Sequence, residues 1–238
     1  VGVFFVALGL RLLQGYGQTE SAPLISINRN EGNKIDSVGP PVKDVEVQIA
    51  GDGEILVRGE LLMNGYWNNP RVTAETIVDG WLHTGDIGVF DDDGCLVITD
   101  RKKDIIVNSG GDNISPQRVE GMLTVEPEIG QAMVYGDRRP HLVAPIVPDQ
   151  DFVSAWGKDR EGAANLASLI TDADFIKAID EAVRRVNAKL TAPERVRRFE
   201  LAAAGFTIDN DMLTPSLKIR RHVIKEIYGE SLETLYGG

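Results

Sequence analysis

The chain has 238 residues, of which 42% are hydrophobic and 26% are charged. This composition is typical of globular domains and excludes a largely disordered chain. The formal net charge is −11, so neither nucleic acid nor an anionic membrane surface is expected as the main partner. The length is sufficient for one large domain or two small domains that each bury a hydrophobic core.

The single cysteine, Cys95, excludes an internal disulfide and a cysteine-based zinc site, and it favours the reducing cytoplasm as the location. The longest apolar run, residues 1–10, is too short to cross a bilayer and lacks the basic start of a signal peptide. We interpret this run as a helix. Because the chain begins at Val1 instead of methionine, we expect it to be a piece of a longer protein.

Up to about Thr99 the chain alternates short predicted strands with turns. Residues 45–49 and 55–57 alternate apolar and polar side chains around a Gly-Asp-Gly turn. Asn69 and Pro70 begin a short helix that runs to about Ile77. Residues 87–90 and 95–99 flank the sequence Asp-Asp-Asp-Gly, which indicates a β-hairpin. Residues 1–100 are therefore predicted to form a β-rich subdomain, a small antiparallel barrel or sheet.

After Asp100 the predicted helices alternate with strands. A helix is expected from Ser115 to about Thr124, and strands over residues 132–135, 142–147 and 196–201. Apolar residues recur at helical spacing from Phe175 to Leu190, which predicts an amphipathic helix. A C-terminal helix is expected over residues 219–228. The fold class is therefore α+β, in which the β-rich subdomain is followed by a smaller α/β sandwich domain, residues 101–238.

Four segments carry a resemblance to a known family: GYGQTE at residues 15–20, the block 79–103, the loop 109–120 and residues 213–221. In this order and spacing they resemble the motifs of the adenylate-forming (AMP-binding) superfamily. The stretch DGWLHTGDIGVFDDDGCLVITDRKK is similar to the fatty acyl-CoA synthetase signature, and NDMLTPSLKIRR to the long-chain form of the last motif. The resemblance covers the whole chain. It implies that residues 1–100 end the large adenylation domain and that residues 101–238 form the small mobile domain, with a hinge near Lys103.

The resemblance assigns the first motif to ATP. Tyr16 would stack on adenine beside Gly17, Thr19 would bind phosphate, and Glu20 would hold Mg²⁺ through a carboxylate oxygen. Because Tyr16 lies between two glycines, the backbone can turn sharply there and expose an aromatic face. The alternative is a turn at the end of an apolar strand, with a solvated glutamate.

The resemblance assigns Asp86 and Arg101 to the ribose hydroxyls of the nucleotide. The carboxylate would accept hydrogen bonds and the guanidinium would donate them. Asp86 follows Thr84 and Gly85 in an expected tight turn, and the predicted hairpin could bring Asp86 and Arg101 together. The alternative is an ordinary turn residue and a surface cation.

Two further assignments concern the C-terminal domain. Gly110 and Gly111 correspond to the loop that lines the pantetheine tunnel of coenzyme A in the family, and a plain loop before a helix is the alternative. Lys218 corresponds to the lysine that reaches the reacting carboxylate and the α-phosphate, so the resemblance makes it catalytic together with Thr19 and Glu20. Leu217 stands where the superfamily more often has glycine. The alternative for Lys218 is a basic residue at the start of a helix.

The resemblance implies a long-chain fatty acid–CoA ligase that uses ATP, Mg²⁺ and coenzyme A. A Ser/Thr/Gly-rich phosphate loop and most of an acyl pocket do not occur in the sequence, so we expect the isolated chain to be inactive. Two alternatives remain: a fatty acyl-AMP ligase that loads a carrier protein, and a non-enzymatic nucleotide-binding or interaction module. No transmembrane segment is expected. Peripheral membrane contact by the full-length protein and the oligomeric state are left open.

Overall fold

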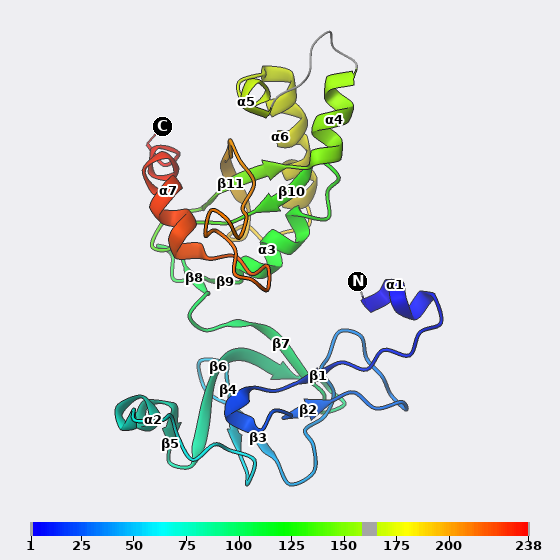
Figure 1. Cartoon of the computed structure of the whole chain (residues 1–238), viewed down its shortest axis with the longest axis vertical. Helices are drawn as coiled ribbons and strands as arrows, with labels where there is room; N and C mark the ends of the chain where they lie inside the picture. Colours follow the sequence, from blue (N-terminus) through cyan, green and yellow to red (C-terminus); the bar gives the residue numbers. More distant parts are fainter. Residues whose placement is uncertain (1, 159–165, 238) are drawn as a thin grey trace. The chain divides into compact units, whose positions relative to one another are not determined.

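The computed structural model describes residues 2–158 and 166–237, and the chain divides into two compact units, Val1–Asp104 and Ile105–Gly238 (Figure 1). Each unit has its own buried core. The first unit is built around a sheet and the second combines helices with a sheet, so the predicted α+β class is confirmed. Lys103, the expected hinge residue, is exposed and lies close to the division between the units.

The main sheet of the first unit is antiparallel, with strand order β3-β4-β6-β5, and β7 pairs with β6 as well. The central strand β6 carries most of the pairing (Figure 1). Asn69 accepts a hydrogen bond from the Val72 amide and so begins the predicted helix α2. The bounds are β3 Glu46–Ile49, β4 Glu54–Arg58, α2 Pro70–Thr76, β5 Ile77–Val78, β6 Trp81–Phe90 and β7 Leu96–Arg101.

Short elements precede this sheet. The predicted N-terminal helix is present as α1, Gly2–Ala7, and its large apolar side chains Phe4 and Phe5 are exposed. Residues 8–14 form no strand, so the apolar strand that the alternative interpretation placed before Tyr16 is absent. Instead Gly15 and Tyr16 form β1, which pairs with β2, Ser26–Ile27. The 3₁₀ helix η1, Thr19–Ser21, lies between these two strands.

Strand β6 contains a bulge opposite β4. The register pairs Glu54 with Ile87 and Leu56 with His83. Between these two pairs β4 has only one residue, whereas β6 has the three residues 84–86. The expected tight turn at Thr84 and Gly85 is therefore wrong: the segment is a bulge within a continuous strand, because the ladder resumes on both sides. Gly85 has φ +70°, a backbone conformation that favours glycine.

The sheet of the second unit has the order β10-β11-β12, in which β10 and β11 are antiparallel and β11 and β12 are parallel. A short hairpin of β8 and β9 precedes it. The bounds are β8 Ile106–Val107, β9 Asn113–Ile114, α3 Pro116–Leu123, β10 Ile129–Ala132, β11 Leu142–Pro148, α4 Gln150–Lys158, α5 Leu166–Leu169, α6 Ala173–Asn187, β12 Val196–Leu201 and α7 Arg221–Thr234.

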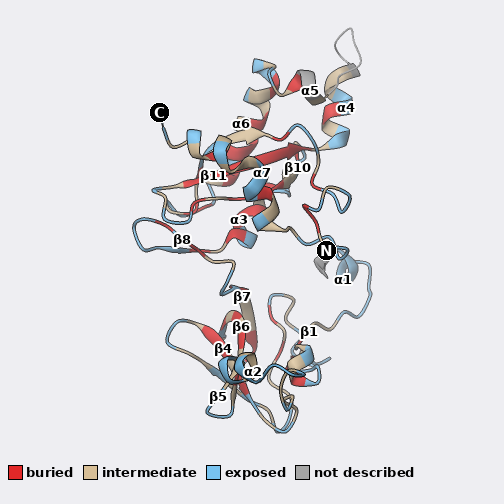
Figure 2. Cartoon of the chain, turned by 60° about the vertical axis from the view of Figure 1, so that its left-hand side comes forward, coloured by how far each residue is buried: buried red, intermediate tan, exposed pale blue. Residues whose placement is uncertain are grey.

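This sheet separates two cores. Leu142, Ala144 and Ile146 face the core that contains α3 and α6, while Val143 and Val147 belong to the core under α7. Successive side chains of a strand point to opposite faces, so a strand covered on both faces is apolar throughout. All seven residues of β11 are indeed buried, and Figure 2 shows this strand in red. The second unit is thus an α/β sandwich.

Most predicted elements of the second unit are confirmed, although several have different limits; the C-terminal helix, for example, extends to Thr234. The strand expected over residues 132–135 begins at Ile129 and ends at Ala132, although Tyr135 still bridges to Val143. The C-terminal helix begins at Arg221 instead of Ile219, because Ile219 bridges to Leu213. None of the helices in the described part of the chain has the length and the apolar character needed to span a membrane.

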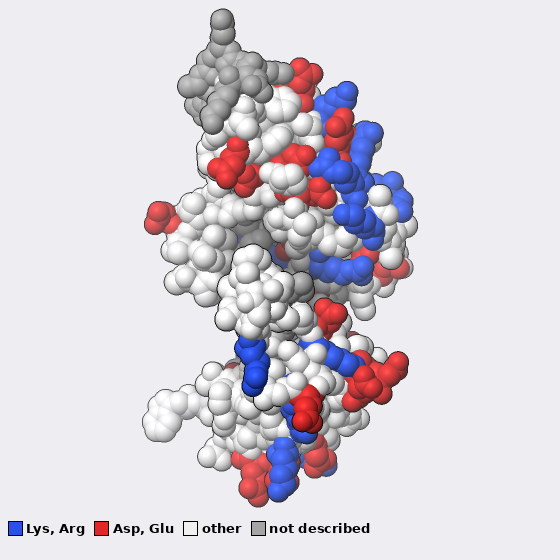
Figure 3. Space-filling model, turned by 90° about the vertical axis from the view of Figure 1, so that its right-hand side faces the viewer, with Lys and Arg blue, Asp and Glu red and all other residues white. Residues whose placement is uncertain are grey.

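Charged side chains of opposite sign lie next to one another on the face of the first unit that Figure 3 shows. The first unit contains ion pairs between Arg58 and Glu46 and between Lys34 and Asp91. The negative charge of the chain is therefore neutralised locally at these points. Ion pairs of this exposed kind contribute little to stability.

Candidate functional site

The first unit gathers three polar side chains around the carboxylate of Asp86. Tyr16 donates its hydroxyl to Oδ2 of Asp86 at 2.7 Å, and Gln18 donates Nε2 to the same oxygen at 2.7 Å. Arg101 donates Nε to Oδ1 at 2.8 Å. Asp86 and Arg101 face each other in the register of β6 and β7. The prediction that the hairpin brings these two residues together is therefore confirmed.

Asp86 is only 6% exposed, so its charge requires the partners that surround it. The Asp86 carboxylate in turn raises the pKa of the Arg101 guanidinium, chiefly through their hydrogen bond. Arg101 keeps 45% of its side chain exposed, so donors of the guanidinium remain accessible at the surface. A partly exposed Arg held by a buried Asp is a suitable group to bind hydroxyls or anions.

Tyr16 differs from the expectation of an exposed aromatic face. The residue is 9% exposed and packs in the core of the first unit, because its hydroxyl reaches inward to Asp86. Burial, followed by the contacts with Asp86, raises the pKa of the Tyr16 phenol well above its usual range. The hydroxyl therefore remains a hydrogen-bond donor at all physiological pH values.

Gly17 has a close neighbour that only glycine permits. An added Cβ would lie 1.4 Å from the carbonyl oxygen of Pro23, which is far inside any allowed contact. The chain therefore passes directly over the Pro23–Leu24 backbone at this point. Gly17 fixes the path that leads from the buried Tyr16 to the more exposed Thr19.

Thr19 and Glu20 lie on η1, where Thr19 is exposed and Glu20 is partly buried. Tyr66 donates its hydroxyl to Oε1 of Glu20 at 2.8 Å. Burial and this hydrogen bond raise the pKa of Tyr66, so it stays protonated and holds the carboxylate in place. Oε2 of Glu20 accepts no hydrogen bond from the residues that the structure describes. A carboxylate oxygen of this kind is a ligand that Mg²⁺ prefers.

A pocket of about 700 Å³ connects these groups. Its lining includes Gly17, Thr19, Glu20 and Arg101, which the sequence singled out, together with Glu54 and His83, which it did not. Within the described residues no group of three or more His, Cys, Asp or Glu side chains could hold a metal ion by itself. A magnesium ion bound through Glu20 would therefore need oxygen ligands from the polyphosphate and from water.

Sequence reasoning missed Gln18, Tyr66, Glu54 and His83. Gln18 lies inside the GYGQTE motif, so its position was a usable signal. Glu54 is a charged residue directly before the apolar strand of Ile55 and Val57, and only the tertiary structure shows that it is buried. Tyr66 and Glu20 are 46 residues apart and no local pattern links them.

In the second unit, Gly110 and Gly111 form an exposed loop between β8 and β9. Asn108 organises this loop, because its Oδ1 accepts the amides of Gly110 and Asp112 at 2.9 Å each. Gly111 has φ +86°, which favours glycine. The loop is thus a structured hairpin connection, and the exposed glycines leave its backbone open to a close approach.

Lys218 lies in a tight loop between the bridged residues Leu213 and Ile219. The amide of Lys218 donates to Oγ1 of Thr214 at 3.0 Å, and its carbonyl accepts the Thr214 amide at 2.9 Å. Lys218 is exposed, and within the described residues no acidic side chain forms an ion pair with it. Leu217 adopts φ +60°, so the structure needs the left-handed conformation at the position where the superfamily more often has glycine.

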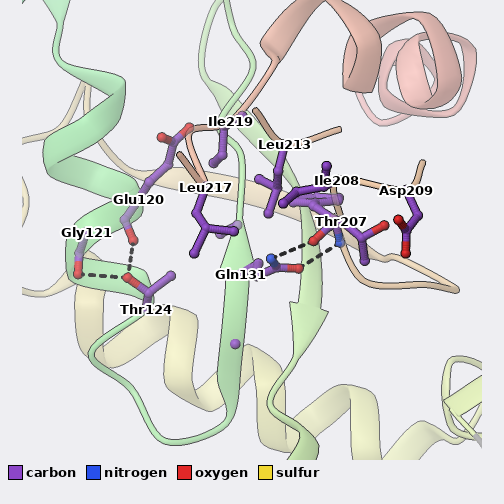
Figure 4. A pocket seen from close by; sticks show the side chains of 13 residues that line it. Glu120, Gly121, Thr124, Gln131, Thr207, Ile208, Asp209, Leu213, Leu217 and Ile219 are labelled. Carbon is purple, nitrogen blue, oxygen red and sulfur yellow. Dashed lines mark hydrogen bonds between the residues drawn. The ribbon is translucent and has the colours of Figure 1, made fainter. Parts of the chain in front are cut away.

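A second pocket, of about 660 Å³, lies beside the Lys218 loop (Figure 4). Leu213, Leu217 and Ile219 contribute apolar side chains to it. Gln131 uses its amide to hold both the N–H and the C=O of Phe206, at 2.7 and 2.9 Å. These bonds fix the loop that contains Thr207, Ile208 and Asp209 over the other wall of the pocket.

The predicted site residues thus fall into two groups. In the first unit Gly17, Thr19, Glu20 and Arg101 line one pocket, and the buried Tyr16 and Asp86 lie behind it, hydrogen-bonded to each other and, through Asp86, to Arg101. Gly110, Gly111 and Lys218 lie in two loops of the second unit. The first group has the hydroxyl, carboxylate and guanidinium groups that a nucleotide site needs, and the second group supplies an exposed ammonium.

The mixed α/β fold and this polar pocket agree with the adenylate-forming class that the sequence motifs indicated. The family model of the AMP-binding enzyme matches residues 3–67, and that of the AMP-binding enzyme C-terminal domain matches residues 103–238. The chain therefore belongs to the AMP-binding enzyme family.

Two curated relatives show how far the similarity extends. The chain is 39% identical over 238 residues to the long-chain-fatty-acid–CoA ligase FadD15 of Mycobacterium bovis, which covers 99% of this chain and 40% of the relative. It is 34% identical over 251 residues to the human long-chain-fatty-acid–CoA ligase 6, which covers 99% of this chain and 36% of the relative. The chain thus spans about two fifths of the length of these relatives.

Solved structures of adenylation enzymes have the same fold. The A domain of a carboxylic acid reductase from Segniliparus rugosus, in complex with AMP and a co-purified carboxylic acid, matches with a TM-score of 0.76 and 26% identity, over 99% of this chain and 37% of that one. The o-succinylbenzoate coenzyme A synthetase of Bacillus subtilis, in complex with AMP, matches with a TM-score of 0.66 and 26% identity, over 92% and 42%.

Proposed function

We propose that the chain forms the C-terminal part of an ATP-dependent fatty acid–CoA ligase for long-chain substrates. The observation that carries the proposal is the cluster around Asp86, in which Arg101, Gln18 and Tyr16 meet beside a pocket that also contains Glu20. The names of the relatives, which are long-chain fatty acid–CoA ligases, support the substrate class. The single cysteine supports a cytoplasmic location.

The proposed reaction has two steps. The fatty carboxylate attacks the α-phosphorus of ATP, so that a carboxyl–phosphate bond forms and pyrophosphate leaves. The thiol of coenzyme A then loses its proton and attacks the acyl carbon, so that a thioester forms and AMP leaves. When bound, Mg²⁺ would neutralise negative charge on the polyphosphate, and Glu20 is the residue of this chain that would supply it with a carboxylate oxygen.

The side chains of the first unit would bind and orient the nucleotide. Asp86 would accept a ribose hydroxyl, while Arg101 would donate to one with the donors that Asp86 leaves unused. Thr19 would donate its hydroxyl to a phosphate oxygen. Only the small accessible part of the Tyr16 ring, beside Gly17, would stack on the adenine, and the buried Tyr16 hydroxyl would hold the ring in place through its hydrogen bond to Asp86.

The second unit would act on the reacting groups. Lys218 would place its ammonium at the carboxylate and the α-phosphate, where negative charge grows in the first step. Gly110 and Gly111 would line the path of the pantetheine arm in the second step, because glycines allow close approach to the backbone. Rotation about a hinge near Lys103 would present these two loops in turn. We also propose that residues 1–238 alone do not form acyl-adenylate, since they contain no Ser/Thr/Gly-rich phosphate loop.

Binding of AMP to the 238-residue chain, measured by calorimetry, tests the nucleotide site. We expect Asp86→Ala to weaken AMP binding at least tenfold, because both a ribose acceptor and the partner of Arg101 are lost. Asp92→Ala is the matched control, since Asp92 is exposed on the turn of the same hairpin. AMP binding that is equal in the Asp86 variant and in the unaltered chain would refute the assignment.

The chemistry is tested in the full-length protein with palmitate, by ATP–pyrophosphate exchange and by thioester formation from synthetic acyl-AMP. Lys218→Ala should slow the exchange about a hundredfold to a thousandfold and spare the thioester step. A bulky residue in place of Gly110 should leave the ATP–pyrophosphate exchange unchanged and slow the thioester step. Transfer to a carrier protein but not to coenzyme A would favour the acyl-AMP ligase alternative, and robust exchange by residues 1–238 alone would contradict the proposed inactivity of the isolated chain.

A further inference from the structure

The bulge in β6 leaves backbone groups without ladder partners, and side chains replace those partners. Glu54 accepts the Gly85 amide with Oε1 at 2.9 Å. Thr84 donates its hydroxyl to the Ile55 carbonyl at 2.7 Å and accepts the Asp86 amide at 3.1 Å. A buried backbone group without a hydrogen-bond partner lowers the stability of the fold. The side chains of Glu54 and Thr84 supply such partners and therefore allow β6 to bulge at residues 84–86.

The second oxygen of Glu54 connects the bulge to the end of β7. Oε2 of Glu54 lies 3.0 Å from Nδ1 of His83 and 2.9 Å from Nζ of Lys102. The amide of Lys102 donates to the Gly85 carbonyl at 2.8 Å. Gly85 is therefore held at both of its peptide groups, by the Glu54 side chain on one side and by the Lys102 backbone on the other.

Glu54 is 4% exposed and is charged at neutral pH. Burial by itself would raise the pKa of this carboxyl, but the hydrogen bonds from His83, Lys102 and the Gly85 amide outweigh it and hold the pKa below its usual range. A carboxylate suits this position because its two oxygens accept three donors at once. A glutamine could accept only through its single oxygen.

The Gly85 bulge also lies between two cavities of the first unit. Thr84, Gly85 and Arg101 line the 700 Å³ pocket that contains Glu20, and they also line a neighbouring pocket of about 380 Å³. The remaining lining of the smaller pocket is Lys102 and Lys103. Between these two cavities Gly85 is linked to Lys102 in two ways, directly by the Lys102 amide and indirectly through the Glu54 carboxylate.

We propose that Glu54 is a positioning residue, which fixes the Gly85–Asp86 segment for nucleotide binding and ties this segment to Lys102, next to the expected hinge. This inference rests on the proposed nucleotide site. Glu54 acts through Gly85, since its own carboxylate is already occupied by protein donors. Loss of the carboxylate should therefore loosen Gly85 and Lys102 together and weaken nucleotide binding through Asp86 and Arg101.

Two measurements on the 238-residue chain test the proposal: amide hydrogen exchange by NMR at Gly85 and Lys102, and AMP binding by calorimetry. Glu54→Ala removes both carboxylate oxygens, while Lys102 keeps its ion pair with Asp52. This variant should weaken AMP binding about tenfold, the factor that the loss of one charge-assisted hydrogen bond implies. Glu54→Gln keeps an acceptor for Gly85 and should restore part of the affinity. Exchange at both amides should rise in the same order, with Ala above Gln.

Glu46→Ala is the matched control, because Glu46 lies on the adjacent strand β3, is exposed and pairs only with Arg58 among the described residues. Glu46→Ala should change neither the amide exchange at Gly85 and Lys102 nor the affinity for AMP. If Glu54→Ala does not fold, the AMP affinity and amide exchange of Glu54→Gln alone test the proposal. Unchanged AMP affinity in a folded Glu54 variant, with Asp86→Ala impaired, would overturn this inference and leave the nucleotide site intact. Failure of the unaltered chain to bind AMP would overturn both this inference and the proposed nucleotide site.

Discussion

Loss of the ion pair between Arg221 and Glu120 should lower the stability of the second unit. Arg221, the first residue of α7, donates Nη1 to Oε1 and Nη2 to Oε2 of Glu120, at 2.6 Å each. Glu120, on α3, also accepts the Val134 amide at 2.8 Å. The pair thus joins two helices and the end of the strand region between them, beside the loop that contains Lys218.

Arg221→Met removes the cation and leaves the Glu120 carboxylate in a buried position. Breaking a buried pair by removing one partner typically costs about 3–5 kcal/mol. We expect the lower end, about 3 kcal/mol, because the Arg221 side chain is 24% exposed and water can replace part of the interaction. With an m value of about 2 kcal/mol/M, this loss lowers the urea midpoint of the second unit by about 1.5 M.

The assay is urea unfolding followed by tryptophan fluorescence. Of the three tryptophans, only Trp156 lies in the second unit, so a background with Trp67→Phe and Trp81→Phe reports on that unit alone. Arg220→Met is the matched control. Arg220 is the adjacent residue and pairs with the exposed Asp211, so its loss should cost less than about 0.5 kcal/mol.

A second substitution shows whether Arg221→Met destabilises the unit through the buried charge of Glu120 or through a general loss of packing. Glu120→Gln keeps an oxygen for the Val134 amide but carries no charge, so adding it to Arg221→Met should recover more than about 1 kcal/mol. A loss below about 1 kcal/mol for Arg221→Met, or a further loss on adding Glu120→Gln, would refute the reasoning.

Three further predictions follow from single positions. Leu217→Gly should raise the unfolding free energy of the second unit by about 0.5–1 kcal/mol, because relief of the left-handed strain of about 1–2 kcal/mol exceeds the entropy cost of glycine; a lower urea midpoint would contradict this. Gly17→Ala should disrupt the first unit and abolish AMP binding, whereas Gly51→Ala, whose Cβ meets nothing within 4 Å, should be neutral in thermal unfolding and calorimetry. Burial raises the pKa of Glu200, so the folded unit favours the protonated form, and the resulting stability is complete below the unfolded pKa and lost as the pH rises. Glu200→Gln should therefore raise the urea midpoint at pH 7 and not at pH 4, and an equal effect at both would exclude this cause.

Local sequence patterns were sufficient to predict most of the helices and strands. The 3.6-residue period of the apolar side chains from Phe175 to Leu190 predicted α6, and Asn69 before Pro70 predicted α2, because both signals act within a few residues of chain. The uniformly apolar β11 was also visible, since both of its faces are covered. The order and spacing of the four motifs likewise indicated the AMP-binding family, which the family comparisons confirm.

What the sequence could not give is the environment of each polar residue. The sequence Thr84-Gly85-Asp86 is compatible with a tight turn and with a bulge inside a strand. Only the pairing of β6 with β4 shows that it is a bulge, which directs Asp86 towards Tyr16 and Arg101.

Glu54 likewise looks like a strand-end charge until its three donors are seen, two of which lie about 30 residues away and the third 48. Local signals determined the elements of this protein, because hydrogen bonds and side-chain periods within a helix or strand are short-range. The tertiary structure alone decided which charges are buried and what neutralises them, because those partners meet only when distant strands pair.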